Sequence, residues 1–391
     1  MKVVTAIDSF KGSMTSMEAG FAAAEGIHRV DADAEVQVRP LADGGEGTVE
    51  ALVAGMNGKT EHVKVTGPLG EPVICEYGII ESTKTAVIEM AGAAGITQVP
   101  DEKRNPLYTT TYGVGEVIKD AIEKGCRRFI VGIGGSATND GGVGMLQALG
   151  YAFLDKDGKQ VLPGARGLKD ITEITAAYVI PELAECKFRV ACDVTNPLCG
   201  ELGCSSIYGP QKGATPEMIQ DMDQWLGAYA ELAKERFPKA DAKYPGTGAA
   251  GGMGFAFLTF TDAVLESGIN IVLDETKLED YIKDADLVIT GEGCMDGQTA
   301  MGKAPVGVAK LAKKYGKKVI AFAGAVQRDA RACNDAGIDA FFPILRGVVT
   351  LDEAMKNENA KQNLADTAEQ VIRLMMGAEL IVEPVEAVTH C

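Results

Sequence analysis

Short apolar runs alternate with amphipathic stretches at both ends of the chain. KVVTAI and EVQVRP near the start are each followed by a helical pattern, and so are DLVIT and KKVIAFAG after residue 285. Nearly continuous apolar strands that alternate with helices are typical of a parallel sheet with both faces covered. We therefore predict that the two ends of the chain form one doubly wound α/β lobe.

The middle of the chain follows a different pattern. HVKVTG, VICEYGII and TAVIEMA are β-type runs joined by turns too short for a helix, so they should pair antiparallel. RRFIVGI indicates a buried strand after a helix whose apolar face has i, i+3, i+4 spacing, formed by Val114, Val117, Ile118, Ala121 and Ile122.

These patterns predict two lobes. Residues 62–261 should form a second α/β lobe with a mixed sheet, inserted into a first lobe made of residues 1–61 and 262–391. Within the first lobe, the terminal segment IVEPVEAVTHC is expected to be a loosely attached tail.

The composition excludes some classes of partner. The chain of 391 residues has 38 basic and 55 acidic side chains, a net charge of −17, and so lacks the basic character that binds nucleic acid. No apolar segment reaches the roughly 18 residues of a membrane span, and Asp8 interrupts the first apolar run. We expect a cytoplasmic protein with reduced thiols and no membrane partner, and a homo-oligomer is compatible with the sequence.

Glycine is concentrated in GIGGSATNDGG, residues 132–142, between a predicted strand and a predicted helix. In this arrangement free backbone N–H groups can face a bound phosphate, and Ser136, Thr138 and Asn139 would add short donors. The same glycines would also suit a loop whose backbone packs closely against a neighbour. The stretch taken alone favours neither function.

Two better-known nucleotide patterns fail in their context. GTGAAG, residues 246–251, matches G-x-G-x-x-G, but no strand precedes it. GQTAMGKA, residues 297–304, resembles a phosphate-binding P-loop, but Ala304 replaces the hydroxyl residue and the predicted strand DLVIT ends too early. Lys303, near the start of a helix, could still meet an anion.

Carboxylates and lysines stand beside glycines in several loops that follow predicted strands. In open α/β sheets, ligands bind at this edge. Phosphoryl transfer uses lysines and N–H groups to neutralise the phosphate, and carboxylates to hold Mg²⁺ and accept a proton. A single such Asp is more often a local cap. The candidates from these loops are Asp8, Ser9, Lys11, Asp43, Gly44, Gly45, Glu46, Asp193, Asn196, Lys212, Glu292, Asp296 and Gln298.

The ordered motifs DSFKGS, PLADGGEGT, GIGGSATNDGG, ACDVTNPLCG, GPQKGA, GAAGGMG and TGEG-x-x-DGQT closely resemble the bacterial glycerate kinase family of type I. The resemblance extends from about Lys2 to about Met376. It implies ATP-dependent phosphorylation of D-glycerate, typically to 2-phosphoglycerate, by a flavodoxin-like lobe and a different α/β lobe with the site in the cleft between them. One departure is Cys294, where family members commonly carry an arginine.

The resemblance gives the candidate residues hypothetical roles, with ATP and Mg²⁺ as the expected cofactors. Lys11 would contact a phosphate or the glycerate carboxylate, and the loop with Gly134, Gly135 and Asp140 would bind a phosphate. Either Asp193 or Asp296 would be the general base; the other would bind Mg²⁺, with Asp43 or Glu46 as further ligands.

Three other functions stay open at this point. The same site could phosphorylate the 3-hydroxyl of glycerate instead. The parallel sheet and GTGAAG would also suit a nucleotide-dependent hydroxy-acid oxidoreductase. Two lobes could equally belong to a binding protein without catalytic activity that closes on a small acid.

Overall fold

The computed structural model describes residues 1–379, so the predicted tail IVEPVEAVTHC lies outside the described part. The chain forms two compact units: unit 1 is Met1–Leu41 with Leu273–Cys391, and unit 2 is Ala42–Val272. Unit 2 is thus inserted into unit 1 along the chain. Its ends differ from the expected 62–261, because helix α2 (Thr48–Gly55) packs on strands of the unit 2 sheet.

Unit 1 is built on a five-stranded sheet in which every neighbouring pair is parallel. Counted along the chain, its strand order is 2-1-3-4-5, the order of flavodoxin-like folds. This confirms the predicted doubly wound lobe. The strands are β1 (Lys2–Ile7), β2 (Glu35–Pro40), β11 (Leu287–Met295), β12 (Lys318–Val326) and β13 (Ala340–Pro343).

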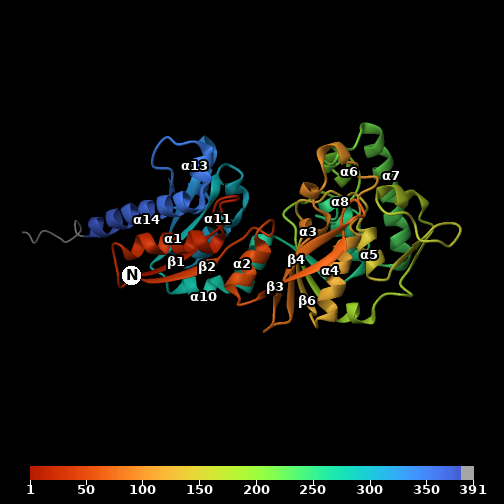
Figure 1. The fold of residues 1–391 in the computed structure, drawn as a ribbon, viewed down its shortest axis with the longest axis horizontal. Helices are drawn as coiled ribbons and strands as arrows, with labels where there is room; N and C mark the ends of the chain where they lie inside the picture. Colours follow the sequence, from red (N-terminus) through yellow and green to blue (C-terminus); the bar gives the residue numbers. More distant parts are fainter. Residues whose placement is uncertain (380–391) are drawn as a thin grey trace, which may run out of the picture. The chain divides into compact units, whose positions relative to one another are not determined.

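Helices cover both faces of this sheet because its strands are apolar on both sides. Helices α1 (Ser16–His28) and α14 (Asn357–Glu379) lie on one face and α10 (Leu278–Lys283) on the other (Figure 1). Thr15 and Glu18 form a capping box that starts α1. The other helices of this part are α9 (Gly268–Glu275), in which the second unit boundary falls, α11 (Ala304–Lys314), α12 (Ala332–Asp335) and α13 (Leu351–Met355).

Strand β11 is longer than the sequence indicates. DLVIT was expected to end at Thr290, but the strand continues to Met295 and pairs there with Val326 of β12. The glycines Gly291 and Gly293 interrupt the apolar pattern without ending the strand, since the parallel partner supplies the hydrogen bonds. Glu292 therefore belongs to a strand. The strand does not end too early for a P-loop, contrary to the sequence-based expectation, but Ala304 still lacks the hydroxyl that a P-loop has at this position.

Unit 2 contains the predicted mixed sheet, in the order β10–β9–β6–β5–β4–β3. The first three strands along the chain pair antiparallel, as expected, and the other neighbours pair parallel. The strands are β3 (Lys59–Thr66), β4 (Pro72–Ile80), β5 (Thr85–Glu89), β6 (Arg128–Gly132), β9 (Lys187–Ala191) and β10 (Ala263–Glu266); β7 (Ala152–Leu154) and β8 (Glu173–Thr175) form a separate hairpin.

Helix α4 (Tyr112–Glu123) of unit 2 buries the face that its sequence predicts. All five apolar residues expected on this face are buried. The rings of Phe129 and Phe188, from neighbouring strands, stack with centroids 4.7 Å apart in the core. The other helices are α3 (Ala91–Ala94), α5 (Val143–Ala148), α6 (Cys204–Tyr208), α7 (Pro216–Arg236) and α8 (Ala249–Phe260).

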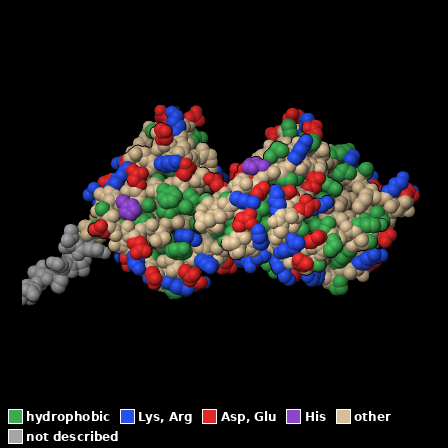
Figure 2. Space-filling model, turned by 60° about the horizontal axis from the view of Figure 1, so that its bottom comes forward, with side chains coloured by type: hydrophobic (Ala, Val, Ile, Leu, Met, Phe, Trp, Pro, Cys, Tyr) green, Lys and Arg blue, Asp and Glu red, His purple; other side chains and the backbone are tan. Residues whose placement is uncertain are grey.

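The face of the molecule seen in Figure 2 mixes acidic, basic and apolar side chains. Within residues 1–379, no helix combines the length and the apolar character that crossing a membrane demands.

Candidate active site

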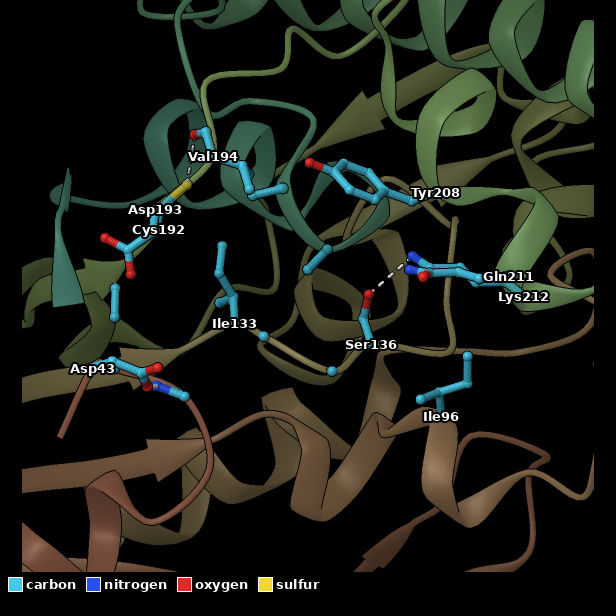
Figure 3. A pocket seen from close by; sticks show the side chains of 17 residues that line it. Asp43, Ile96, Ile133, Ser136, Cys192, Asp193, Val194, Tyr208, Gln211 and Lys212 are labelled. Atoms are coloured by element: carbon cyan, nitrogen blue, oxygen red, sulfur yellow. Dashed lines mark hydrogen bonds between the residues drawn. The ribbon is translucent and has the colours of Figure 1, made fainter. Parts of the chain in front are cut away.

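Unit 2 contains a pocket of ≈ 480 Å³ at the carboxyl ends of the parallel strands β6 and β9 (Figure 3). Neighbouring parallel strands end at the same edge, so the loops that follow them meet there. The loop before α2, the α6 region and the start of α8 complete the wall. The pocket is lined by Asp43, Gly44, Gly45, Ile96, Ile133, Gly134, Gly135, Ser136, Ala191, Cys192, Asp193, Val194, Tyr208, Gln211, Lys212, Ala249 and Ala250.

Two carboxylates, Asp43 and Asp193, lie at one end of this pocket (Figure 3). Burial raises the pKa of Asp193, hydrogen bonds from Ser267 and Gly268 oppose the rise, and the charge of Asp43 adds to it. The backbone N–H of Gly268 donates to Asp193 Oδ1 at 3.2 Å, and that of Gly45 donates to Asp43 Oδ1 at 2.9 Å. Asp193 is therefore an oriented carboxylate whose proton affinity is higher than usual.

A buried cation, Lys212, lies toward the other end (Figure 3). Its Nζ donates to Ser136 Oγ at 2.9 Å and to the Thr138 carbonyl at 2.6 Å, and the residue is only 2% exposed. Burial lowers the pKa of Lys212 to about 8. Lys212 and Ser136 thus form a pair of donors with little access to bulk water, beside the exposed backbone of Gly134 and Gly135.

The glycines of residues 132–142 differ in their surroundings, since some allow close packing and others line the pocket. A Cβ on Gly132 would lie 2.4 Å from the Gly44 carbonyl oxygen, so this glycine allows two loops to pack. Gly44 itself has φ 88°, and a Cβ there would lie 2.6 Å from Gly268 Cα. Gly134 and Gly135 line the pocket instead, and a Cβ on Gly134 would meet nothing within 4 Å.

Thr138, Asn139 and Asp140, from the same loop, are buried and do not line the pocket. Asp140 accepts hydrogen bonds from the backbone N–H groups of Thr111 at 2.8 Å and Gly142 at 3.1 Å, and from the Thr111 hydroxyl at 2.9 Å. The amide of Asn139 donates to Ser205 Oγ at 2.8 Å. Burial raises the pKa of Asp140 against these hydrogen bonds. The side chains of Asn139 and Asp140 thus hold the loop in place from inside unit 2.

Two other candidates of unit 2 lie around the pocket. Glu46 is exposed and is not a lining residue. Asn196 accepts a hydrogen bond from the Tyr208 hydroxyl at 2.7 Å and donates to the Leu202 carbonyl at 2.8 Å. It therefore orients Tyr208, whose ring lines the pocket.

The sequence did not single out Tyr208, Ala249 or Ala250 as pocket residues. The two alanines belong to GTGAAG, which lacks the strand of a dinucleotide site but still forms part of the wall. Helix α8 is interrupted there, with positive φ at Ala250, Gly251 and Gly252. The clustered glycines around these alanines were the available signal.

The remaining candidates belong to unit 1: Asp8, Ser9 and Lys11 follow β1, Glu292 lies in β11, and Asp296 and Gln298 follow it. Thr299 joins the two acids, since its hydroxyl donates to Glu292 Oε1 at 2.5 Å and its N–H to Asp296 Oδ1 at 3.0 Å. Burial raises the pKa of Asp296, but the Thr299 N–H and the charge of Lys303 outweigh it, so the pKa is lowered. Asp296 therefore stays ionised to a lower pH than an ordinary aspartate does.

The pocket fits a Mg²⁺ ion that arrives with phosphate. Mg²⁺ is usually bound by one or two carboxylates together with substrate phosphates and water. Asp43 and Asp193 provide such a pair, close enough for the charge of one to raise the pKa of the other. Among residues 1–379, no group of three His, Cys, Asp or Glu side chains forms a closed metal site.

Known proteins resemble this chain over nearly its whole length. The model of the glycerate kinase family matches residues 3–376. The chain is 50% identical to a glycerate kinase of Haemophilus influenzae, with 96% of this chain and 99% of that protein covered, and 48% identical to the glycerate 2-kinase of Escherichia coli, with 94% and 98% covered.

A solved structure of a candidate glycerate kinase 2 from Salmonella typhimurium LT2 has 45% sequence identity and a TM-score of 0.90, covering 97% of this chain and 99% of that one. The fold, the order of the motifs and the extent of these matches lead to one conclusion: the chain belongs to the glycerate kinase family.

Proposed function

We propose that the protein transfers the terminal phosphoryl group of ATP to the 2-hydroxyl of D-glycerate, with Mg²⁺, giving 2-phosphoglycerate. Membership of the glycerate kinase family supports the reaction class. One observation in the structure carries the proposal further: the pocket of unit 2 has a buried lysine and glycine N–H groups toward one end and two carboxylates at the other. Phosphoryl transfer needs both kinds of group.

Phosphate binding is assigned to Lys212, Ser136 and the backbone of Gly134 and Gly135. These donors are held before a ligand arrives, since Lys212 already contacts Ser136 and the Thr138 carbonyl. Preorganised donors in a water-poor site stabilise developing charge at little reorganisation cost. The same group therefore neutralises the transferred phosphoryl group.

The general base is assigned to Asp193 rather than Asp296. A base works best when its pKa is not far below the working pH; the pKa of Asp193 is raised and that of Asp296 is lowered. Asp193 accepts the proton of the attacking hydroxyl late, as the new O–P bond forms. Gly268 and Ser267 hold the carboxylate in position for this step.

With Asp193 as the base, Asp43 would hold Mg²⁺ in the pocket. Asp296, which stays ionised, keeps its expected role as a metal ligand of unit 1. When bound, the ion would neutralise charge on the phosphate oxygens. Lys11 is retained as a contact of a phosphate or of the glycerate carboxylate.

Two measurements test the proposal. Release of ADP should depend on D-glycerate, and phosphorus NMR of the product should show 2-phosphoglycerate. A 3-phosphoglycerate signal would overturn the position of transfer. A change in NAD(P)H absorbance with hydroxy acids would favour the oxidoreductase, and glycerate binding without ADP release would favour a binding protein.

A further inference from the structure

Helix α2 begins beside the pocket but has no cap from its own segment. Its N-cap residue is Gly47, with φ 90°, and no side chain of the segment bonds to the first turn. The first backbone N–H groups of a helix need acceptors from elsewhere. Glu89, the last residue of β5, supplies them: its Oε1 accepts the Val49 N–H at 2.9 Å, and its carboxylate also receives hydrogen bonds from the Gly47 and Thr48 backbone.

Glu89 also lies at the start of the glycine loop. It pairs with Gly132 across the parallel strands β5 and β6, and the N–H of the next residue, Met90, donates to the Gly132 carbonyl at 2.9 Å. Gly132 in turn packs against the Gly44 carbonyl. Glu89 thus connects two loops that line the pocket: its carboxylate holds the start of α2 after residues 43–45, and its backbone lies beside Gly132, which precedes residues 133–136.

The charge on Glu89 suits this place. An anion at a helix N-terminus is favoured by the helix dipole. Burial raises the pKa of Glu89, the three backbone donors oppose this, and the charge of Glu46 adds to the rise. Glu89 itself is absent from the pocket lining, so it would not contact a ligand there.

We propose that Glu89 is a positioning residue, which holds Asp43, Gly44 and Gly45 against the glycine loop by accepting the first N–H groups of α2. Its effect on substrate is therefore indirect and passes through Asp43 and the two glycines. The kinetic consequence rests on the proposed kinase function, whereas the structural consequence does not.

The test compares Glu89→Ala, Glu89→Gln and the control Glu71→Ala, an exposed glutamate of the same unit. Hydrogen exchange of the unliganded proteins should be faster at residues 43–49 in Glu89→Ala, and the rest of unit 2 should exchange as in the wild type. The KM for substrate should rise about 10- to 100-fold, the usual loss when a supporting contact is removed, with a smaller change in kcat. Glu89→Gln keeps an acceptor oxygen, so its exchange rates and KM should lie closer to those of the wild type. Glu71→Ala should have the same exchange rates and KM as the wild type.

Two outcomes would overturn the positioning role. One is unchanged exchange at residues 43–49 in Glu89→Ala. The other is a lower melting temperature of Glu89→Ala together with wild-type KM and kcat at temperatures where the variant is still folded. That result would make Glu89 a purely structural residue. If the wild-type protein released no ADP with glycerate, the proposed function would fail, but the exchange comparison would still decide the role of Glu89.

Discussion

The two units each contain a strand, a glycine-containing loop and a lysine, yet they treat that lysine differently. In unit 1, the side chain of Lys303 is 36% exposed and its Nζ lies 3.6 Å from Asp296 Oδ1. In unit 2, Lys212 is 2% exposed and donates to Ser136 and to the Thr138 carbonyl, both neutral groups. Both lysines stand next to a glycine in sequence, and they differ in their environment.

This difference indicates where an anion would bind more strongly. A charge removed from water is costly, and the lowered pKa of Lys212 reflects that cost. A cation in such a place interacts more strongly with an incoming phosphate, because the effective dielectric constant is low. The partly exposed Lys303 is screened by solvent and by Asp296. We therefore expect function to depend more on Lys212.

The largest effect is expected from the carboxylates. Asp193→Asn should lower kcat by about 10²- to 10⁴-fold, the usual contribution of a general base, and Asp296→Asn should also reduce turnover strongly. Steady-state ADP release measures both, with circular dichroism to check folding. Near-normal turnover in both variants would rule out the roles given to these residues.

The lysines give the direct test of the comparison. Lys212→Met should lower kcat/KM by about 10²- to 10³-fold, as expected for the loss of one preorganised donor. Lys303→Met, its counterpart in unit 1, should change kcat/KM by less than about tenfold, because its charge is largely screened. Equal losses in the two variants would contradict the distinction between the units.

Asp140 should affect stability more than catalysis. In Asp140→Asn one acceptor oxygen becomes an NH₂ group among backbone donors, so we expect the free energy of unfolding to fall by about 1–3 kcal/mol. Urea unfolding measures this change. The control Asp157→Asn, on an exposed loop, should stay within about 0.5 kcal/mol of the wild type. An unchanged free energy of unfolding in Asp140→Asn would show that the buried hydrogen bonds do not stabilise the loop.

The smallest effect is a pH dependence. Lys212 is charged below its pKa of about 8 and neutral above it. If the cation binds phosphate, kcat/KM should fall as the pH rises through about 8, since this ratio reports the free enzyme. A pH profile of Lys212→Arg should lack this alkaline limb, because arginine stays protonated. An identical limb in that variant would assign the titration to another group.

The sequence located much of the candidate site, for a physical reason. Ligand loops follow parallel strands, and Asp43, Gly44, Gly45 and Asp193 stand in such loops. Lys212 lies in a short 3-10 helix after α6, and its glycine-flanked position was the signal. It was harder to predict which side chains of a loop line the pocket and which are buried behind it. Ser136 lines the pocket while Thr138 and Asp140 turn inward, and no local pattern distinguishes these neighbours.

Other features depended on partners distant in the chain. Glu89 caps a helix through Val49, 40 residues earlier, and Tyr208 is held by Asn196 through a side-chain hydrogen bond. Strand β11 extends through two glycines because its neighbour β12 pairs with it. None of these contacts leaves a periodic signal in the sequence.

The sequence by itself determined the alternation of strands and helices, the antiparallel middle segment and the set of glycine, carboxylate and lysine loops. These follow from local rules: apolar periodicity, turn chemistry and the edge at which parallel strands end. Only the tertiary structure decided which glycines pack and which line the pocket, and which lysine is buried. The physical reason is that burial and its effect on charge arise from residues far apart in the chain, as when Lys212 contacts Ser136 and Thr138.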